Sequence, residues 1–422
     1  MNRPYYGWVV VVACFLATFV VFGLSYSFGV FLEAMLAEFD RSRGVTTIAF
    51  GVQTFLLYVG AVAVGVAVDR YGTRRTLLAG GALVCTGLVL TSRATSFATV
   101  VLAFGVVTGI GLSAVYVVAY ATVPRWFDRR AGLAGGVASA GLGIGMLVVA
   151  PAATALVDRV GWRSSFLVLA AAVAVLVLVA AALIRDEPTT EPVPDAEFAA
   201  GDPALEDGGS PTLREQFGDV LAVARSPSFG LLFVGWVSIY TTMYVVFVHL
   251  VVYATDIGLS RAVGATAIAV IGGANAVGRI GIGHLADRLG RVRVFAGCSA
   301  VMGVATLALP ALETLGGFVA FALVFGLAYG GNGALLAPLT SDLFGRANIN
   351  AVFGLISGAF AVSGLLSPYL AGVGYDVLGT YEPTFVATGT AALVGAAAVL
   401  AAGRRRADTD RRRGSEPDSH TG

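Results

Sequence analysis

The chain has 422 residues, of which 57% are hydrophobic and 13% are charged, and its formal net charge at pH 7 is +1. Soluble chains carry roughly 25% charged residues, so the composition excludes a water-soluble globular protein and predicts a surface that faces lipid. The near-balance of charge gives no indication of a nucleic-acid partner.

Apolar segments long enough to cross a membrane, which takes about 20 residues, recur in two sets. The first set is predicted near residues 7–31, 45–68, 76–92, 97–123, 131–157 and 164–184. The second set is predicted near residues 228–254, 262–284, 294–312, 317–340, 349–374 and 380–403. The sequence therefore predicts an all-α polytopic membrane protein with twelve transmembrane helices in two six-helix bundles.

Hydrophilic stretches set the expected boundaries of these bundles. We expect an N-terminal bundle over 1–184, a cytoplasmic linker over 185–227 and a C-terminal bundle over 228–403. The linker opens on acidic and proline-rich sequence, which is typical of disordered segments. The remaining residues, 404–422, are expected to form a disordered cytoplasmic tail.

The placement of the arginines predicts the orientation, because all 27 basic residues of the chain are arginine. With a cytoplasmic N-terminus, the loops and termini on that side carry twenty arginines and the opposite loops carry six. Positive residues favour the cytoplasmic side of a membrane. Both termini are therefore predicted to be cytoplasmic, in a multi-pass protein of the plasma membrane.

One short motif occurs once in each half, each time at the end of an apolar segment. Its two copies are Gly65-x-x-x-Asp69-Arg70-x-Gly72 and Gly283-x-x-x-Asp287-Arg288-x-Gly290. A charged turn that returns at the same place in each half of an apolar chain indicates a duplicated unit, which is typical of transporters. In one interpretation the motif only holds the loop on the cytoplasmic side. In the other it is a conformational latch, which also includes Arg129 and Arg130.

The repeated turn and the six-plus-six arrangement resemble the major facilitator superfamily. A narrower resemblance, to the monocarboxylate porter family with its oxalate/formate antiporter branch, is carried by motifs around the fourth and fifth segments. These are Gly109-x-Gly111-x-x-x-x-Tyr116, Trp126-Phe127-Asp128-Arg129-Arg130, Gly132-Leu133-Ala134-x-Gly136, Ala140-Gly141, Pro151 and Gly161-Trp162-Arg163, with Tyr6-Gly7-Trp8, Tyr329-Gly330-Gly331-Asn332 and Pro338 elsewhere.

Arg279 is the candidate substrate-binding residue with the strongest physical argument. It precedes Asp287 by eight residues, which at 1.5 Å per residue places it about 12 Å from the helix end, near the middle of a hydrocarbon core of roughly 30 Å. An arginine at that depth costs about 2.5–3.5 kcal/mol or more unless it meets a polar cavity or partner. Its guanidinium group can bind a carboxylate through two hydrogen bonds. The alternative is an arginine whose hydrogen bonds go to backbone carbonyl groups of a neighbouring helix.

The resemblance implies the same role, since an arginine at the matching place is associated with substrate binding in the monocarboxylate porters. Asn275, one turn earlier, stands where the animal carriers have an aspartate implicated in proton coupling, and an asparagine cannot titrate. The second intramembrane cation of the oxalate/formate branch has no counterpart in residues 356–366. One fixed positive charge matches one carboxylate, so a monocarboxylate is favoured over a dicarboxylate.

Further candidates for the substrate site are polar residues inside the apolar segments. Tyr116 and Tyr329 are expected to need a partner for the hydroxyl group at mid-membrane depth, although tyrosines in membrane helices also serve as interface anchors. Tyr120 and Asn332 lie about one helical turn from them. His249 is either a packing residue or, because of its near-neutral intrinsic pKa, a proton carrier.

The predicted function is secondary active transport of a small organic monocarboxylate, similar to lactate or pyruvate, by alternating access. Proton symport, exchange and uniport remain open. The alternatives are an antiporter of dicarboxylates, an exporter of compounds other than carboxylates, and a non-transporting receptor or scaffold. The sequence contains no nucleotide-binding motif, metal cluster or nucleophile triad, so neither an enzyme nor a cofactor is predicted. The expected partners are the organic anion, protons and the lipid bilayer, with the monomer as the functional unit.

Overall fold

The computed structural model describes residues 5–127, 131–185, 222–345 and 349–414. The elements of the N-terminal bundle are α1 (Gly7–Tyr26), α2 (Phe28–Phe39), α3 (Arg43–Tyr71), α4 (Thr73–Ser92), α5 (Phe97–Val100), the π-helix η1 (Val101–Thr108), α6 (Gly109–Ala121), the short 3₁₀ turn η2 (Val123–Arg125) and α7 (Ala131–Leu183). Those of the C-terminal bundle are α9 (Pro227–Asp256), α10 (Arg261–Leu289), α11 (Arg291–Ala308), the 3₁₀ turn η5 (Leu309–Ala311), α12 (Leu315–Phe344), α13 (Ile349–Leu378) and α14 (Glu382–Gly414).

Within these described ranges, 11 helical segments are long and apolar enough to cross a membrane, and α7 supplies two crossings. It runs over 53 residues but is interrupted at Gly161, whose φ of 76° is non-helical. A positive φ is open to glycine at little steric cost, and the chain reverses there between the two segments predicted at 131–157 and 164–184. The prediction of twelve crossings in an all-α fold is confirmed.

The C-terminal tail begins differently from the sequence-based expectation. Helix α14 does not stop near residue 403 but continues to Gly414, so residues 404–414 are helical. Their arginines and aspartates alternate at helical i,i+4 spacing without an intervening glycine or proline, a pattern that supports a helix in water. Most of the expected linker and the end of the tail lie outside the described residues.

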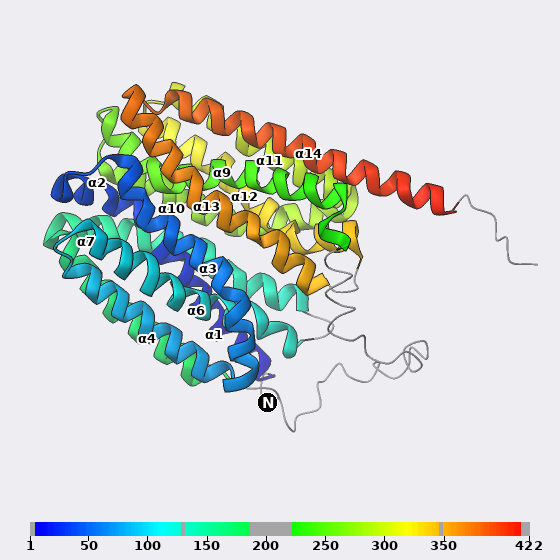
Figure 1. The fold of residues 1–422 in the computed structure, drawn as a ribbon, viewed down its shortest axis with the longest axis horizontal. Helices are drawn as coiled ribbons and strands as arrows, with labels where there is room; N and C mark the ends of the chain where they lie inside the picture. Colours follow the sequence, from blue (N-terminus) through cyan, green and yellow to red (C-terminus); the bar gives the residue numbers. More distant parts are fainter. Residues whose placement is uncertain (1–4, 128–130, 186–221, 346–348, 415–422) are drawn as a thin grey trace, which may run out of the picture.

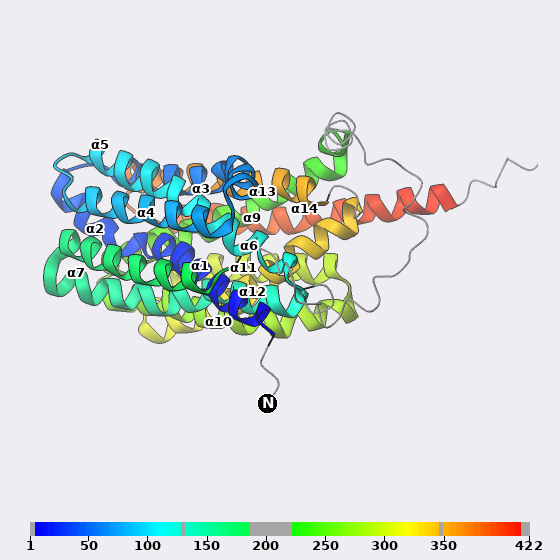
Figure 2. The same cartoon turned by 90° about the horizontal axis from the view of Figure 1, so that it is seen from below.

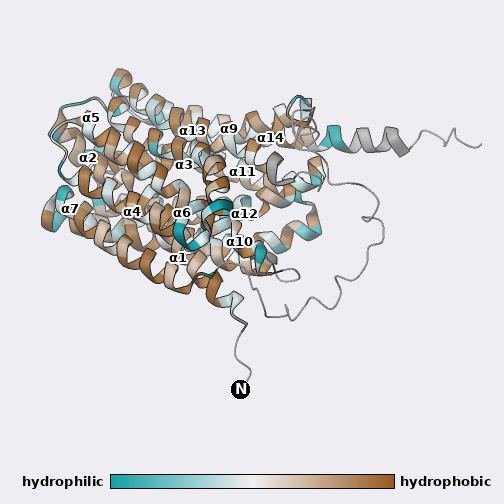
Figure 3. Ribbon diagram, turned by 60° about the horizontal axis from the view of Figure 1, so that its bottom comes forward, coloured by the Kyte–Doolittle hydropathy of each residue, from teal (hydrophilic) through white to brown (hydrophobic). Residues whose placement is uncertain are grey.

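Two ends of the molecule are distinguished here by the loops they carry. The terminal end holds the start of α1, the end of α14 and the turns near residues 72, 126, 290 and 345, and the distal end holds the turns near 41, 94, 161, 258, 313 and 380. Along the helices hydrophobic residues dominate, with hydrophilic residues gathered near the ends (Figure 3). This distribution fits a bundle whose middle faces hydrocarbon.

The two bundles contact each other mainly in the distal half, where α3 packs on α13 and α7 packs on α10. Glycines allow both contacts. A Cβ atom at Gly51 would lie 2.9 Å from the Leu365 carbonyl oxygen, and at Gly143 or Gly272 it would overlap the carbonyl oxygen of the other glycine. Toward the terminal end the ribbons of the two bundles diverge (Figure 1), and α3 becomes exposed there, with Val62 at 75% exposure. At the distal end, α2, α5 and one end of α7 lie together (Figure 2).

Candidate functional site

Arg279 lies on α10 and makes hydrogen bonds to both bundles. Its Nε donates to Asn275 Oδ1 at 3.1 Å, and its Nη1 donates to Ser139 Oγ at 3.2 Å. Ser139 comes from α7, in the other bundle. Both partners are neutral, so they orient the guanidinium without compensating its charge. The positive charge predicted from the sequence is therefore present between the two halves.

Helix packing places the guanidinium at this position. The close crossing of Gly143 on α7 and Gly272 on α10 lies about one turn from Ser139 and two turns from Arg279. On the other side of the side chain, a Cβ atom built at Gly333 of α12 would lie 2.9 Å from Arg279 Nη2. Glycine at 333 thus leaves the room that the guanidinium occupies.

Asn275 contributes a further donor beside the guanidinium. Its side chain is fully buried; Oδ1 accepts from Arg279, while Nδ2 has no hydrogen-bond partner in the described part of the chain. A buried donor without a partner costs about 1–3 kcal/mol. Because Asn275 occupies Nε, a two-oxygen ligand would bind the edge formed by Nη1 and Nη2, where it would meet the Ser139 hydroxyl at Nη1. The chemistry of this group is that of a site for an anion.

A layer of aromatic rings lies between the bundles next to this site. Tyr116 contacts Tyr120 with ring centroids 4.8 Å apart and Tyr58 at 5.6 Å, and Tyr58 stacks across the interface on Phe360 at 5.2 Å. Tyr120 is 38% exposed. The ring layer therefore continues from a buried part of the interface to a part that solvent reaches.

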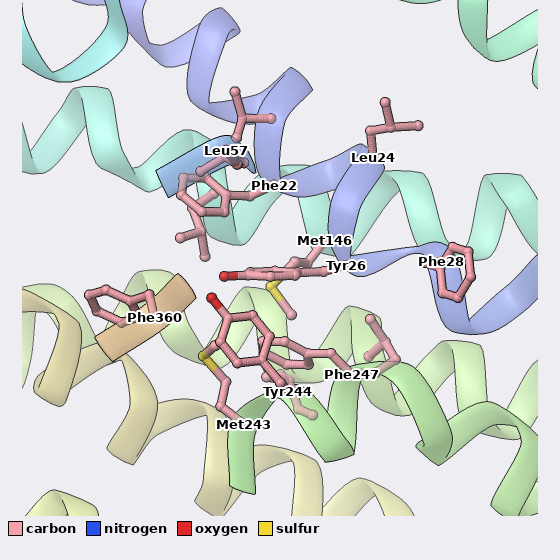
Figure 4. Packing of buried hydrophobic residues seen from close by; sticks show 14 of the residues in the cluster. Phe22, Leu24, Tyr26, Phe28, Leu57, Met146, Met243, Tyr244, Phe247 and Phe360 are labelled. Atoms are coloured by element: carbon pink, nitrogen blue, oxygen red, sulfur yellow. The ribbon is translucent and has the colours of Figure 1, made fainter. Parts of the chain in front are cut away.

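On the C-terminal side the layer includes Tyr329, whose ring lies 5.7 Å from that of Phe247, which packs on Tyr26 at 4.4 Å. Figure 4 shows the hydroxyl groups of Tyr26 and Tyr244 pointing into one space between the bundles, beside Phe360. A Cβ atom built at Gly330, the residue after Tyr329, would overlap the Asn275 carbonyl oxygen, so this part of the layer lies beside Arg279. Arg279 and the three predicted tyrosines of the layer, Tyr116, Tyr120 and Tyr329, are called the Arg279 group below.

Ser139, Tyr26 and Tyr58 were not among the predicted site residues. The two tyrosines meet the criterion that selected Tyr116, a hydroxyl group well inside an apolar segment, and could have been found by it. Ser139 gave no such signal, because a serine in a glycine-rich apolar helix is common.

Two predicted residues lie apart from the Arg279 group. Asn332 is fully buried inside the C-terminal bundle, where its Oδ1 accepts from the Tyr240 hydroxyl and its Nδ2 donates to Ser299 Oγ at 2.8 Å. His249 is also fully buried and hydrogen-bonds to the Tyr381 hydroxyl at 2.8 Å and the Pro368 carbonyl at 2.9 Å. The hydrogen-bonding groups of both side chains are occupied by their own bundle.

The repeated turn makes ion pairs within each bundle. Asp69 pairs with Arg125 at 2.8 Å, while Asp287 lies 3.7 Å from Arg291, which also reaches Asp342 at 2.9 Å. Gly72 and Gly290, with φ of 85° and 91°, end the helices that precede them. In this conformation, then, these pairs do not hold one bundle to the other. Arg129 and Arg130 lie outside the described residues, and the latch stays a prediction, as do the roles of Gly65, Arg70, Gly283 and Arg288.

Charged contacts between the bundles occur instead at the distal end. Arg43 of α3 forms a two-pronged pair with Asp256 of α9, at 2.6 and 2.7 Å, and lies over the ring of Tyr375 at 3.6 Å. The Asp376 carboxylate accepts from the backbone N–H groups of Arg43 and Gly44, at 2.9 and 3.0 Å, and so caps the start of α3 from the other bundle.

In a second cross-bundle contact, the arginine comes from the C-terminal bundle and the carboxylates come from the N-terminal bundle. Arg261 of α10 reaches Glu33 of α2 at 3.0 Å and Asp158 of α7 at 2.8 Å. Together, the contacts of Arg43 and Arg261 are called the distal gate below. In the sequence, both arginines stand out only as charges of the predicted loops.

Two duplicated helical bundles, with an arginine between them that has no acidic partner among the described residues, are typical of secondary membrane transporters. The chain belongs to the Major Facilitator Superfamily, whose family model matches residues 14–309 and 274–421. This confirms the resemblance inferred from the repeated turn.

Among curated proteins, the chain is similar to monocarboxylate transporters. It is 29% identical to monocarboxylate transporter 12 of Mus musculus, covering 92% of this chain and 83% of the relative, and 30% identical to monocarboxylate transporter 3 of Rattus norvegicus, covering 91% and 77%. Among solved structures, a bacterial homologue of the human lysosomal transporter Spinster, inward-facing and unoccupied, superposes with a TM-score of 0.77 at 16% identity, covering 97% of this chain and 99% of that one.

Proposed function

We propose that the chain moves a small organic monocarboxylate, of the size of lactate or pyruvate, across the plasma membrane by alternating access. The observation that carries the proposal is the Arg279 guanidinium, held between the bundles by two neutral partners. The names of the similar monocarboxylate transporters support the same substrate class. A carrier of a monocarboxylate needs one fixed positive charge at its substrate site, and Arg279 supplies it.

In the proposed mechanism, the substrate carboxylate binds the Nη1–Nη2 edge of Arg279, since Asn275 already occupies Nε. The unpartnered Asn275 Nδ2 donates to the same carboxylate or to a neighbouring oxygen of the acid. Binding neutralises the guanidinium and competes with Ser139 for Nη1. The hydrogen bond between the bundles is exchanged for one to the substrate, which lets them rock about the bound acid while Tyr116 and Tyr329 cover its apolar part.

The arginine distribution supports a cytoplasmic terminal end. With that orientation, the closed distal gate and the diverging terminal end (Figure 1) correspond to a conformation open to the cytoplasm. The similarity to an inward-facing solved transporter fits this assignment. Because Asn275 does not titrate, a coupled proton does not pass through position 275.

Net uptake into proteoliposomes tests the proposal. Wild-type protein should accumulate labelled lactate or pyruvate, and Arg279→Ala should abolish accumulation, because the carboxylate then has no counter-charge. Arg279→Lys should retain reduced uptake with a raised KM, since lysine keeps the charge but loses the planar fork. Arg293→Ala removes an exposed arginine and serves as the matched control.

The other outcomes point to the alternatives. Carboxylate uptake that Arg279→Ala leaves unchanged would contradict a carboxylate site at Arg279. A wild-type protein without any carboxylate flux would favour an exporter of other compounds or a non-transporting receptor or scaffold. Uptake measured with and without an imposed pH gradient separates proton symport from exchange and uniport.

A further inference from the structure

A directed chain of hydrogen bonds connects a buried histidine to the distal gate. His249 of α9 lies between the Pro368 carbonyl of α13 and the hydroxyl of Tyr381, which precedes α14. The same phenol oxygen accepts from Arg43 Nη1 at 3.1 Å, and Arg43 holds the two bundles together through Asp256. His249 is therefore one phenol group away from the ion pair that closes the distal end.

The partners determine the protonation state of this histidine in the closed gate. A carbonyl oxygen only accepts hydrogen bonds, so Nε2 of His249 must carry a hydrogen and donate it to Pro368. Nδ1 then accepts from the Tyr381 hydroxyl, whose oxygen accepts from Arg43. With a neutral imidazole, every donor in the chain of hydrogen bonds from Arg43 through Tyr381 to His249 and on to Pro368 has an acceptor.

Adding a proton to His249 disrupts this chain of hydrogen bonds. It would bind Nδ1, where the Tyr381 hydroxyl hydrogen now points, so the phenol would have to turn its hydrogen away. The single phenol oxygen would then face two cationic donors, at 2.8 Å from His249 and 3.1 Å from Arg43. Like charges within about 4–6 Å of each other destabilise the charged forms.

We propose that His249 is a proton-binding site that controls the distal gate: the closed gate requires the neutral imidazole, and protonation favours the open gate. By linkage, a proton that favours opening is in turn expelled by closing. With the orientation proposed above, acid outside the cell would hold the transporter open to the outside. The proposal concerns the gate alone and does not depend on which substrate Arg279 binds.

The other charged and titratable groups around His249 are one guanidinium, two carboxylates and three phenols. They are Arg43 of α3, Asp256 and Tyr253 of α9, Asp376 and Tyr375 of α13, and Tyr381 before α14. Carboxylates titrate near pH 4 and phenols near pH 10 in the absence of perturbation, whereas histidine titrates near 6.5. Between about pH 5.5 and pH 8, histidine is therefore the group expected to change its charge.

Distances between spin labels across the distal end test the proposal without any substrate. Cysteine pairs at Arg93 and Leu315, both exposed at the distal end of opposite bundles, report the opening of the gate. A pair at Arg74 and Arg293 reports the terminal end. The three native cysteines are first replaced by alanine or serine, and the protein is held in lipid nanodiscs.

In the wild-type background, lowering the pH from about 8 to about 5.5 should raise the ratio of distal-open to distal-closed molecules by about tenfold. At pH 5.5 a histidine with the ordinary pKa of about 6.5 is protonated about ten times more often than it is neutral, whereas the closed gate keeps it neutral. His249→Gln keeps a donor and an acceptor but cannot take a proton, so its ratio should change less than about twofold. Tyr381→Phe, which removes the phenol oxygen between His249 and Arg43, should weaken the pH response.

The matched control is His284→Gln, at the terminal end, which should leave the full pH response. A wild-type gate that ignores pH between these values would overturn the proposal. So would a pH response that survives unchanged in His249→Gln. Failure of carboxylate uptake in proteoliposomes would leave these distances unaffected, so the two proposals fail separately.

Discussion

At the scale of single residues, the position of the Arg279 guanidinium depends on neighbours from three helices, Asn275 on α10, Ser139 on α7 and Gly333 on α12. The depth of Arg279 follows from counting along one helix, and so does its neighbour Asn275, one turn away. Ser139 and Gly333 could not be predicted in the same way, because they lie on other helices and reach the guanidinium only through the rotation of those helices. Helix rotation depends on packing, which hydrophobic periodicity does not specify in segments that are apolar on all sides.

Gly333→Ala is predicted to impair substrate binding more than stability. The added Cβ would lie 2.9 Å from Nη2 of Arg279, and the flexible arginine can move away at little cost to the fold. The guanidinium then leaves its position, and the apparent KM for the acid should rise by about tenfold, equivalent to about 1.4 kcal/mol of binding energy. Uptake kinetics and thermal unfolding measured on the same preparation check this prediction.

Gly281→Ala is the control for this substitution, because a Cβ there meets no atom within 4 Å. It should leave KM unchanged. An unchanged KM in Gly333→Ala as well would show that the guanidinium position seen here does not matter for binding.

At the scale of elements, the crossing of α7 and α10 is the contact that organises the site. The sequence predicted both helices with ends within a few residues of those observed, and it predicted the reversal after residue 157 from the loss of hydrophobicity. It did not predict which helices meet across the bundles. Small residues mark close helix contacts in membranes, but the chain has 55 glycines, too many for any one of them to identify a partner.

Gly143→Ala is predicted to damage both stability and transport. Its Cβ would overlap the Gly272 carbonyl oxygen, which belongs to backbone and cannot rotate away. Separating the helices should cost about 1–3 kcal/mol and should move Ser139 away from Arg279. Thermal unfolding in nanodiscs and uptake in proteoliposomes measure the two effects.

Gly135→Ala, on the same helix, is the matched control, since no atom lies within 4 Å of its added Cβ. Replacing a helical glycine by alanine is favourable by up to about 1 kcal/mol, so this variant should be as stable as the wild type or more so. Equal stability of the two variants would contradict a tight crossing at Gly143.

At the scale of the whole molecule, the duplication predicted from the repeated turn is confirmed by the fold, but the observed ionic contacts between the halves are elsewhere. The turn residues Asp69 and Asp287 pair within their own bundles, whereas Arg43 and Arg261 join the bundles at the distal end. One amino-acid sequence adopts all the conformations of a transporter. The repeated motif alone therefore could not predict which end of the molecule is closed in the conformation described here.

Arg43→Gln is predicted to shift the molecule away from the conformation described here. It removes the pair with Asp256 and the cation over Tyr375, contacts that exist only while the distal end is closed. A partly buried charged pair of this kind should change the open-to-closed ratio by about tenfold, or about 1.4 kcal/mol. Spin-label distances across the distal end provide the measurement, with Arg41→Gln at an exposed loop position as the control.

Combining Arg43→Gln with Asp256→Asn gives the decisive comparison for this contact. If Asp256 acts only through Arg43, the double variant should open no further than Arg43→Gln alone. Additive effects would mean that the two residues stabilise the closed gate independently.

The central claim, that Arg279 binds the carboxylate of the transported acid, is tested most directly by counterflow. Proteoliposomes loaded with unlabelled lactate or pyruvate exchange it for external labelled acid without any ion gradient, so the result is independent of coupling. We predict exchange by the wild type, reduced exchange by Arg279→Lys and none by Arg279→Ala, with all three proteins inserted to the same level. Exchange by Arg279→Ala at the wild-type rate and KM would contradict the account.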